Sequence, residues 1–122
     1  MAERLLIVIA NTDPHNPAQL GAPFFQATVA AAMDYPVEVI FTGGAGQLAV
    51  KAEPEKLLVT KDSSRTVYEF MQEAHESGVR FSVCTPSVEF WGDDLIPEID
   101  QTVGAAYIIS RAMEEGTVTF TY

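Results

Sequence analysis

Six consecutive apolar residues at positions 5–10 constrain the fold of this chain more than any other feature. A strand without polar residues has no face that suits water, so it must be covered on both sides. Strands of this kind belong to parallel sheets whose connecting helices pack on both faces. The run therefore predicts a strand in the interior of an α/β sheet.

Strand and helix patterns alternate along the rest of the chain. Further strands are predicted at 37–42, 57–60, 80–84 and 117–121, and helices at 17–33, 47–51, 62–77 and 102–114. Because parallel neighbours need crossover connections, the alternation favours helices on both faces of one sheet. Residues 1–122 are therefore predicted to form a single α/β domain, a three-layer sandwich with a mostly parallel sheet of about five strands.

Two of the predicted helices carry start signals. Asn16 and Pro17 have the cap-then-proline order of a helix start, and Pro23 then either kinks this helix or marks a restart after the preceding glycine. In the helix at 62–77, Thr66 and Glu69 have the spacing of a capping box.

The formal net charge of −10, spread over the whole sequence, limits the partners of the chain. Nucleic acid and anionic membrane surfaces attract clustered Lys and Arg side chains, so neither is expected to bind. The acidity either favours a basic protein partner or only keeps the protein in solution.

One cysteine among 122 residues is typical of a protein from a reducing compartment. It excludes an internal disulfide, a zinc finger and an iron–sulfur site held by cysteines, and no metal is expected. The apolar run at 5–10 is too short for a signal peptide or a membrane span. The expected location is the cytoplasm.

Ligands of parallel α/β sheets bind at the carboxyl ends of the strands. Four loops are expected at that edge, namely 11–15, 42–46, 60–63 and 84–87. The edge locates a candidate site without naming its function.

Cys84, the only cysteine, ends one predicted strand. Thr85 is expected to cap a helix that begins at Pro86, and the positive end of such a helix favours the reactive thiolate. The hydroxyl groups of Thr85 and Ser87 can add hydrogen bonds, whereas the acidic residues of segment 89–94 oppose ionisation. The alternative is that Cys84 is a small buried apolar residue, as free cysteines often are.

The loop after the first strand contributes Asn11 and His15 to the candidate site. A histidine beside a cysteine activates it as a nucleophile, but a solvated loop histidine is the simpler interpretation. No spacing in the sequence shows that His15 and Cys84 meet.

Gly43 and Gly44 begin a glycine-rich segment that directly follows a strand. This position suggests a phosphate-binding loop, but the segment has neither a P-loop ending nor a GxGxxG pattern, and a tight turn explains it more simply. Trp91 and its neighbour Phe90 are expected to form a pocket wall or a subunit contact, or to fill the core.

Three segments together resemble the DsrE/DsrF-like family of small sulfur-transfer proteins. They are the N-P-x-x-x-G-A-P-F-F stretch from Asn16, the cysteine that ends a strand, and L-I-P-E-I-D before V-G-A-A-Y. The resemblance covers nearly the whole chain. It implies a compact α/β subunit that assembles into homotrimers or hexamers.

The resemblance also implies a chemistry. A family cysteine carries sulfane sulfur as a persulfide and exchanges it with TusA-like carrier proteins, and only Cys84 can fill that role here. No cofactor is implied beyond this covalently bound sulfur. The chain is most similar to stand-alone forms associated with sulfur oxidation, and other relatives serve tRNA thiolation.

The expected function is thus a sulfur carrier or sulfurtransferase centred on Cys84. Whether it turns over as an enzyme or only carries sulfur stays open. Two alternatives also stay open: a non-catalytic subunit or scaffold of a sulfur-relay complex with an inert Cys84, and a nucleotide- or small-molecule-binding module that uses segment 43–46.

Overall fold

The computed structural model describes residues 2–13, 15–59 and 64–122. Its centre is a sheet of five parallel strands in the order β4-β3-β2-β1-β5. The strands are β1 (Arg4–Ile9), β2 (Val37–Phe41), β3 (Arg80–Cys84), β4 (Ile99–Val103) and β5 (Thr117–Thr121). The predicted α/β class is confirmed, and β1 lies inside the sheet as its apolar sequence requires.

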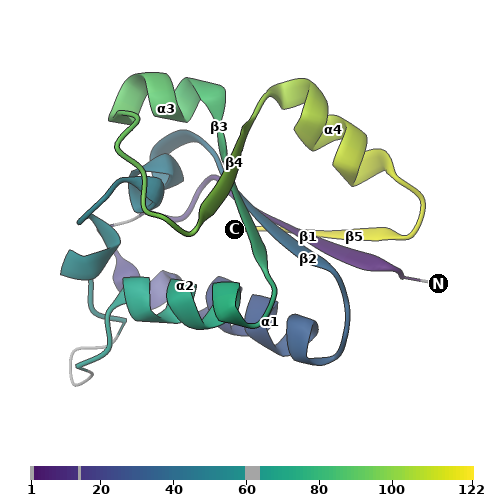
Figure 1. The fold of residues 1–122 in the computed structure, drawn as a ribbon, viewed down its shortest axis with the longest axis horizontal. Coiled ribbons are helices and arrows are strands. Elements are labelled where there is room, and N and C mark those ends of the chain that lie inside the picture. Colours follow the sequence, from purple (N-terminus) through teal and green to yellow (C-terminus); the bar gives the residue numbers. More distant parts are fainter. Residues whose placement is uncertain (1, 14, 60–63) are drawn as a thin grey trace.

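Helices cover both faces of the sheet (Figure 1). One face carries α1 (Gly21–Ala32) and α2 (Val67–Glu76), and the opposite face carries α3 (Thr85–Trp91) and α4 (Ala105–Met113). Three short 3-10 helices, η1 (Pro17–Gln19), η2 (Gly43–Ala49) and η3 (Pro54–Lys56), lie in the connections. The arrangement is the expected three-layer sandwich.

The predicted helix at 17–33 is two separate helices, η1 and α1, rather than one helix with a kink at Pro23. The η1 turn ends at Gln19, α1 begins at Gly21, and Pro23 falls in the first helical turn, where a missing N–H costs nothing. Thr66 is the N-cap of α2, as the capping-box spacing predicts, and its hydroxyl accepts a hydrogen bond from the Glu69 N–H at 3.2 Å. The Glu69 carboxylate lies 3.7 Å from Arg65 Nε. Helix α2 begins later than predicted, because residues 64–66 are not helical, and the predicted start at 62–63 lies outside the described residues.

One predicted strand is wrong and another was missed. Segment 57–59 forms only an isolated bridge between Leu58 and Thr66, and Thr60 lies outside the described residues. The missing strand is β4, part of which was predicted as helix. As an edge strand β4 is only half covered, so its polar residues at 100–102 hide the strand signal. Cys84 therefore ends the third strand, not the fourth.

The two faces of the sheet differ in chemistry. Beneath α1 and α2 lies a continuous apolar core, in which the rings of Phe24, Phe41 and Phe81 lie 5.8–6.1 Å apart between centroids. Beneath α4 the buried apolar residues are Leu6, Ile40 and Val103 alone among the described residues. That face also holds a polar cluster around the buried side chain of Glu38 in β2, which the prediction of a strand at 37–42 did not anticipate.

Candidate functional site

Two of the four predicted loops meet at the carboxyl edge of the sheet. The loop after β2 and the loop after β3 are joined by hydrogen bonds from Ser87 and Trp91 to the Gly43 carbonyl oxygen. The predicted loop at 60–63 lies outside the described residues. The predicted edge therefore contains a real cluster, and Cys84 is part of it.

Cys84 is both the last residue of β3 and the N-cap of α3. Helix α3 begins at Thr85, one residue earlier than predicted, so Cys84 rather than Thr85 takes the cap position. The side chain is 7% exposed, and its Sγ lies 3.1 Å from Ser87 Oγ. The Cys84 side chain accepts no capping hydrogen bond from the N–H groups of α3, so its polar contact is with the Ser87 hydroxyl. The sulfur thus lies beside a polar group although it is buried.

Ser87 connects the sulfur to the neighbouring loop. The Ser87 hydroxyl lies 3.2 Å from the Gly43 carbonyl oxygen, to which it donates, and it has only one hydrogen to give. Its Oγ therefore accepts from the Cys84 S–H while the cysteine is a thiol. The Gly43 oxygen has a second donor, Trp91 Nε1–H at 3.0 Å. The result is a chain of hydrogen bonds that runs from Cys84 through Ser87 to Gly43.

Gly46 permits this chain, and sequence reasoning missed it. A Cβ atom at Gly46 would lie 2.5 Å from Ser87 Cβ and 3.1 Å from Trp91 Cδ1, so only glycine lets η2 pack this closely against α3. The glycine run was the available signal, but it was interpreted as a turn. That interpretation holds for Gly43, whose φ is +53°.

A cleft of about 330 Å³ opens beside the sulfur. It is lined by Gly43, Gly44, Pro86, Ser87, Phe90 and Trp91. The rings of Phe90 and Trp91 meet edge to face at 4.7 Å between centroids, and Phe90 is 77% exposed. Ser87 lines the cleft and Cys84 does not, so the Ser87 hydroxyl lies between the open space and the sulfur.

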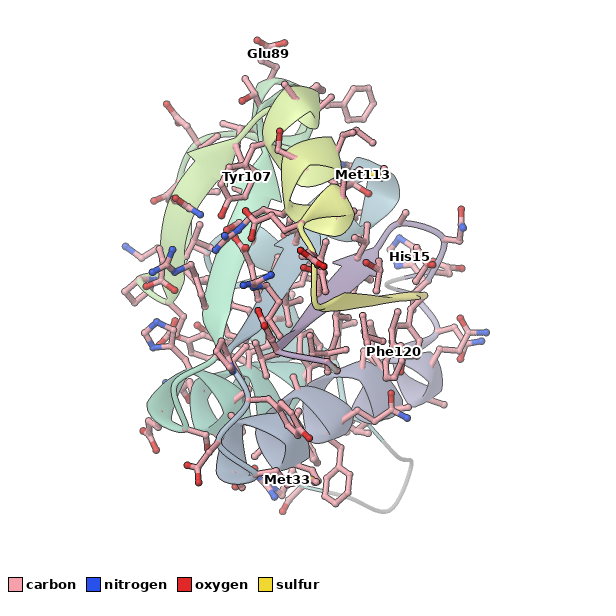
Figure 2. All side chains as sticks on the ribbon, turned by 90° about the vertical axis from the view of Figure 1, so that its right-hand side faces the viewer. His15, Met33, Glu89, Tyr107, Met113 and Phe120 are labelled. Carbon is pink, nitrogen blue, oxygen red and sulfur yellow. The ribbon has the colours of Figure 1, made fainter. Side chains whose placement is uncertain are left out.

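The remaining predicted site residues make other contacts. The Thr85 hydroxyl donates to the Val103 carbonyl oxygen at 3.2 Å, and the Asn11 N–H donates to the Tyr122 carbonyl oxygen at 2.9 Å. The His15 N–H donates to Asp13 Oδ1, and Figure 2 shows His15 well apart from α3, which carries Glu89. In the part of the chain that the structure describes, no hydrogen bond joins these residues to Cys84.

The chemistry available at this edge is that of one thiol with a hydroxyl partner. Among the described residues, no group of three His, Cys, Asp or Glu side chains is placed to hold a metal ion. A thiolate can attack a sulfane sulfur without a metal, but passing the sulfur on needs a second thiol from another molecule.

No helix of residues 2–13, 15–59 and 64–122 has the length and apolar character needed to cross a bilayer.

Solved structures share the fold over nearly the whole chain. The ychN protein from E. coli superposes with a TM-score of 0.75 at 10% identity, over 98% of this chain and 99% of that one. A conserved protein of unknown function from Bacteroides thetaiotaomicron gives a TM-score of 0.62 at 14% identity, over 97% and 94% of the two chains. At these identities the likeness establishes the fold alone. Among curated proteins, no sequence matches.

A family model identifies the chain more directly. The model of the DsrE/DsrF-like family matches residues 4–121, which include every strand and helix described above. That family is associated with sulfur relay in general. The chain therefore belongs to the DsrE/DsrF-like family.

Proposed function

We propose that this protein is a sulfur carrier that holds sulfane sulfur as a persulfide on Cys84. The observation that carries the proposal is the contact between Cys84 Sγ and Ser87 Oγ at the end of β3, in a chain of the DsrE/DsrF-like family. Cys84 is the only thiol in the sequence, so any sulfur bound through a thiol must be bound there.

The transfer step is a thiol exchange. The Cys84 thiolate attacks the outer sulfur of a persulfide on a partner, a new S–S bond forms, and the S–S bond of the donor breaks. The donor leaves as a thiolate and takes up a proton from water. The sulfane sulfur moves without a net oxidant or reductant. Delivery is the reverse step, in which the acceptor thiolate attacks the outer sulfur on Cys84.

The Ser87 hydroxyl can form a hydrogen bond with the Cys84 sulfur both when it is a thiol and when it is anionic. When Cys84 is a thiol, Ser87 accepts from it and donates to the Gly43 carbonyl oxygen. When the sulfur is anionic, the Ser87 hydroxyl can turn and donate to it, because the Gly43 oxygen keeps the hydrogen bond from Trp91. A charge-assisted hydrogen bond of this kind is about twice as strong as a neutral one. Ser87 would thus stabilise the nucleophile and act as a positioning residue.

The partner in this proposal is a small TusA-like or other sulfur-carrier protein. A basic surface around the carrier's cysteine would be attracted by the net charge of −10. We place the exchange in the cytoplasm and in sulfur oxidation, with the protein as a homotrimer or hexamer. Nucleic acid and membrane have no part in the proposal.

The test is the intact mass of the native protein after incubation with polysulfide or with a persulfidated carrier. We expect the mass of added sulfur on the wild type and none on Cys84→Ser. A Ser87→Ala variant should load about tenfold more slowly, as the loss of one hydrogen bond to a charged sulfur predicts. If the wild type gains no sulfur, or if Cys84→Ser gains as much, the proposal is wrong.

The burial of Cys84 favours one other function, that of a non-catalytic subunit in a sulfur-relay complex. An inert thiol would react slowly with iodoacetamide in the native protein and rapidly after unfolding. A carrier should instead be alkylated in the native state, and sulfur loading should protect it.

A further inference from the structure

Strand β5 presents an unpaired edge on one side of the sheet. The Tyr122 N–H donates to the Val8 carbonyl oxygen at 2.9 Å, and the Tyr122 carbonyl accepts from the Ala10 N–H at 2.8 Å, so the backbone of Tyr122 faces β1. Successive residues of a strand face opposite sides, so the backbone groups of Thr119 and Thr121 face away from the sheet. β5 is the terminal strand of the described sheet on this side.

The opposite edge of the sheet is protected and this one is not. The register of the pairing between β3 and β4 shifts between Phe81 and Ser82. The Asp100 carboxylate of β4 accepts a hydrogen bond from the Phe81 N–H at 2.9 Å. Bulges and charges of this kind prevent edge strands from pairing with other chains. β5 pairs with β1 in continuous register over all its residues, and its sequence T-V-T-F-T has no charge and no proline. It therefore has the properties of a strand that accepts a partner.

An apolar groove lies beside this edge and is lined by residues of β5 and α1. Figure 2 labels two residues of its lining, Phe120 of β5 and Met33 at the end of α1. It has a volume of about 580 Å³. Its exposed apolar side chains are Phe25, Val29, Met33, Tyr35, Val118 and Phe120. Phe25 and Met33 are each 62% exposed. At the usual area of such side chains, the exposed part sums to on the order of 500 Å², which is at the upper end for a free monomer surface.

The charge of the chain does not prevent a second copy from covering the groove. Two copies that each carry −10 repel one another over most of their surfaces. None of the six apolar side chains carries charge, and Arg4 is the charged residue among those that line the groove. A second copy can therefore approach closely at this face. The apolar area together with the strand edge approaches the roughly 800 Å² per partner of a standard interface.

We propose that a second copy of this chain docks here, with the two β5 strands antiparallel around a two-fold axis at Thr119. The sequence T-V-T-F-T is suited to this symmetry, because it places Val118 of one copy opposite Phe120 of the other. Both side chains lie on the α1 side and would fill the groove of each copy. Pairs of aromatic and β-branched residues are favourable across antiparallel strands.

The backbone groups agree with this register. The two Thr119 residues would exchange two N–H to carbonyl hydrogen bonds, as residues that face each other's backbone do. The Thr117 N–H already donates to the Glu114 carbonyl oxygen at 3.1 Å, so Thr117 offers only its carbonyl to Thr121 of the other copy. The contact would thus form about four backbone hydrogen bonds in all.

This inference selects between the two oligomers proposed above, because it is compatible with the hexamer and not with the homotrimer, and it does not depend on sulfur chemistry. A two-fold contact gives a dimer, or a hexamer if a three-fold contact exists elsewhere, but not a trimer alone. A trimer in solution would therefore contradict the β5 contact and leave persulfide formation on Cys84 untouched.

Disulfide trapping tests the register directly, in a Cys84→Ser background that removes the native thiol. Thr119→Cys places two cysteines opposite each other at a Cα separation of about 5.5 Å, within the range of a disulfide. We expect a covalent dimer under mild oxidation. Thr117→Cys alone should give no covalent dimer, because position 117 of one copy faces position 121 of the other and the two introduced cysteines lie far apart. A mixture of Thr117→Cys and Thr121→Cys should cross-link. Equal trapping by Thr117→Cys alone, or no trapping by Thr119→Cys, overturns the proposal.

Sedimentation of the unmodified chain tests the surface without a new cysteine. We expect a reversible assembly with an even number of subunits, and a rise of about 100-fold in its dissociation constant for Phe120→Glu, since a charge would be buried at the contact. Ile109→Glu, which places the same charge on an exposed apolar residue of α4, should leave the constant unchanged. A wild type that stays monomeric at all concentrations, or equal weakening by the two variants, contradicts the proposal.

Discussion

The two faces of the sheet are built on different principles. Under α1 and α2 the sheet contributes mainly apolar side chains, and three phenylalanine rings pack together at its centre. The exception is at the edge strand β4, where Asp100 lies 3.1 Å from His75 Nε2 of α2. Under α4 the sheet contributes a buried carboxylate, Glu38, and α4 itself has no fully buried residue. Apolar burial is strong but has no preferred direction, whereas hydrogen bonds fix an orientation. The first face therefore holds the fold together, and the second sets where α4 sits.

Glu38 organises the second face. Its carboxylate accepts hydrogen bonds from Ser82 Oγ at 2.7 Å, Gln101 Nε2 at 3.1 Å and the Tyr107 hydroxyl at 2.9 Å. Arg111 Nε lies 3.4 Å away. A hydrogen bond to Glu114 raises the pKa of Arg111 further, although desolvation opposes it, so Arg111 stays charged. The donors come from β3, β4 and α4, so one side chain ties three elements together.

The largest effect is expected from the apolar face. Phe81→Ala removes the ring that contacts both Phe24 and Phe41, and should lower the free energy of unfolding by about 3–5 kcal/mol. Urea denaturation followed by circular dichroism measures this. A loss below about 1 kcal/mol would mean that the site collapses around the cavity and that the face is less tightly packed than described.

A smaller but specific effect is expected from the polar face. Glu38→Ala leaves the Ser82, Gln101 and Tyr107 donors without their acceptor and should cost about 2–3 kcal/mol. Tyr107→Phe, which removes one donor and keeps the ring, is the matched control and should cost about 1 kcal/mol. The double variant should lose less than the sum, because both changes remove the same bond. Strict additivity would show that the cluster is not a unit.

The contrast between the faces also explains what the sequence could predict. Strand patterns and helical periodicity located β1, β2, β3, β5, the helices of the apolar face and α4. The polar face gives a weaker signal. Asp100, Gln101 and Thr102 made β4 look like loop and helix, and nothing in segment 37–42 indicated that Glu38 is buried. Local sequence does not record the hydrogen bonds that make such residues fit.

The candidate site divides in the same way. The strand-end position of Cys84 and the nearness of Ser87 follow from local spacing, and both could be predicted. The meeting of Gly43 with Ser87 and Trp91 could not, because it depends on how η2 packs against α3. Gly46, which allows that approach, has meaning only once both segments are in place.

The smallest effect concerns a hydrogen bond at the rim of the apolar face. The Tyr68 hydroxyl of α2 donates to Glu98 Oε1 at 2.7 Å. Burial, followed by this hydrogen bond and the charge of Glu98, raises the pKa of Tyr68 from 10.0 to about 12. A group whose pKa is higher in the folded state stabilises the protein fully below its unfolded pKa and less as pH rises. The stabilisation by Tyr68 should therefore be complete below pH 10 and lost between pH 10 and about 12.

The tyrosinate absorbance, followed as pH rises, measures the ionisation of Tyr68 directly. Tyr68→Phe should remove a late-ionising phase near pH 12 and cost about 0.5–1 kcal/mol at neutral pH, less than Glu38→Ala because one partly exposed bond is lost instead of several buried ones. Tyr122, whose pKa is also raised by burial, remains in the variant as an internal reference. If Tyr68→Phe proves as costly as Glu38→Ala, hydrogen bonding matters equally on both faces, and the division drawn between them fails.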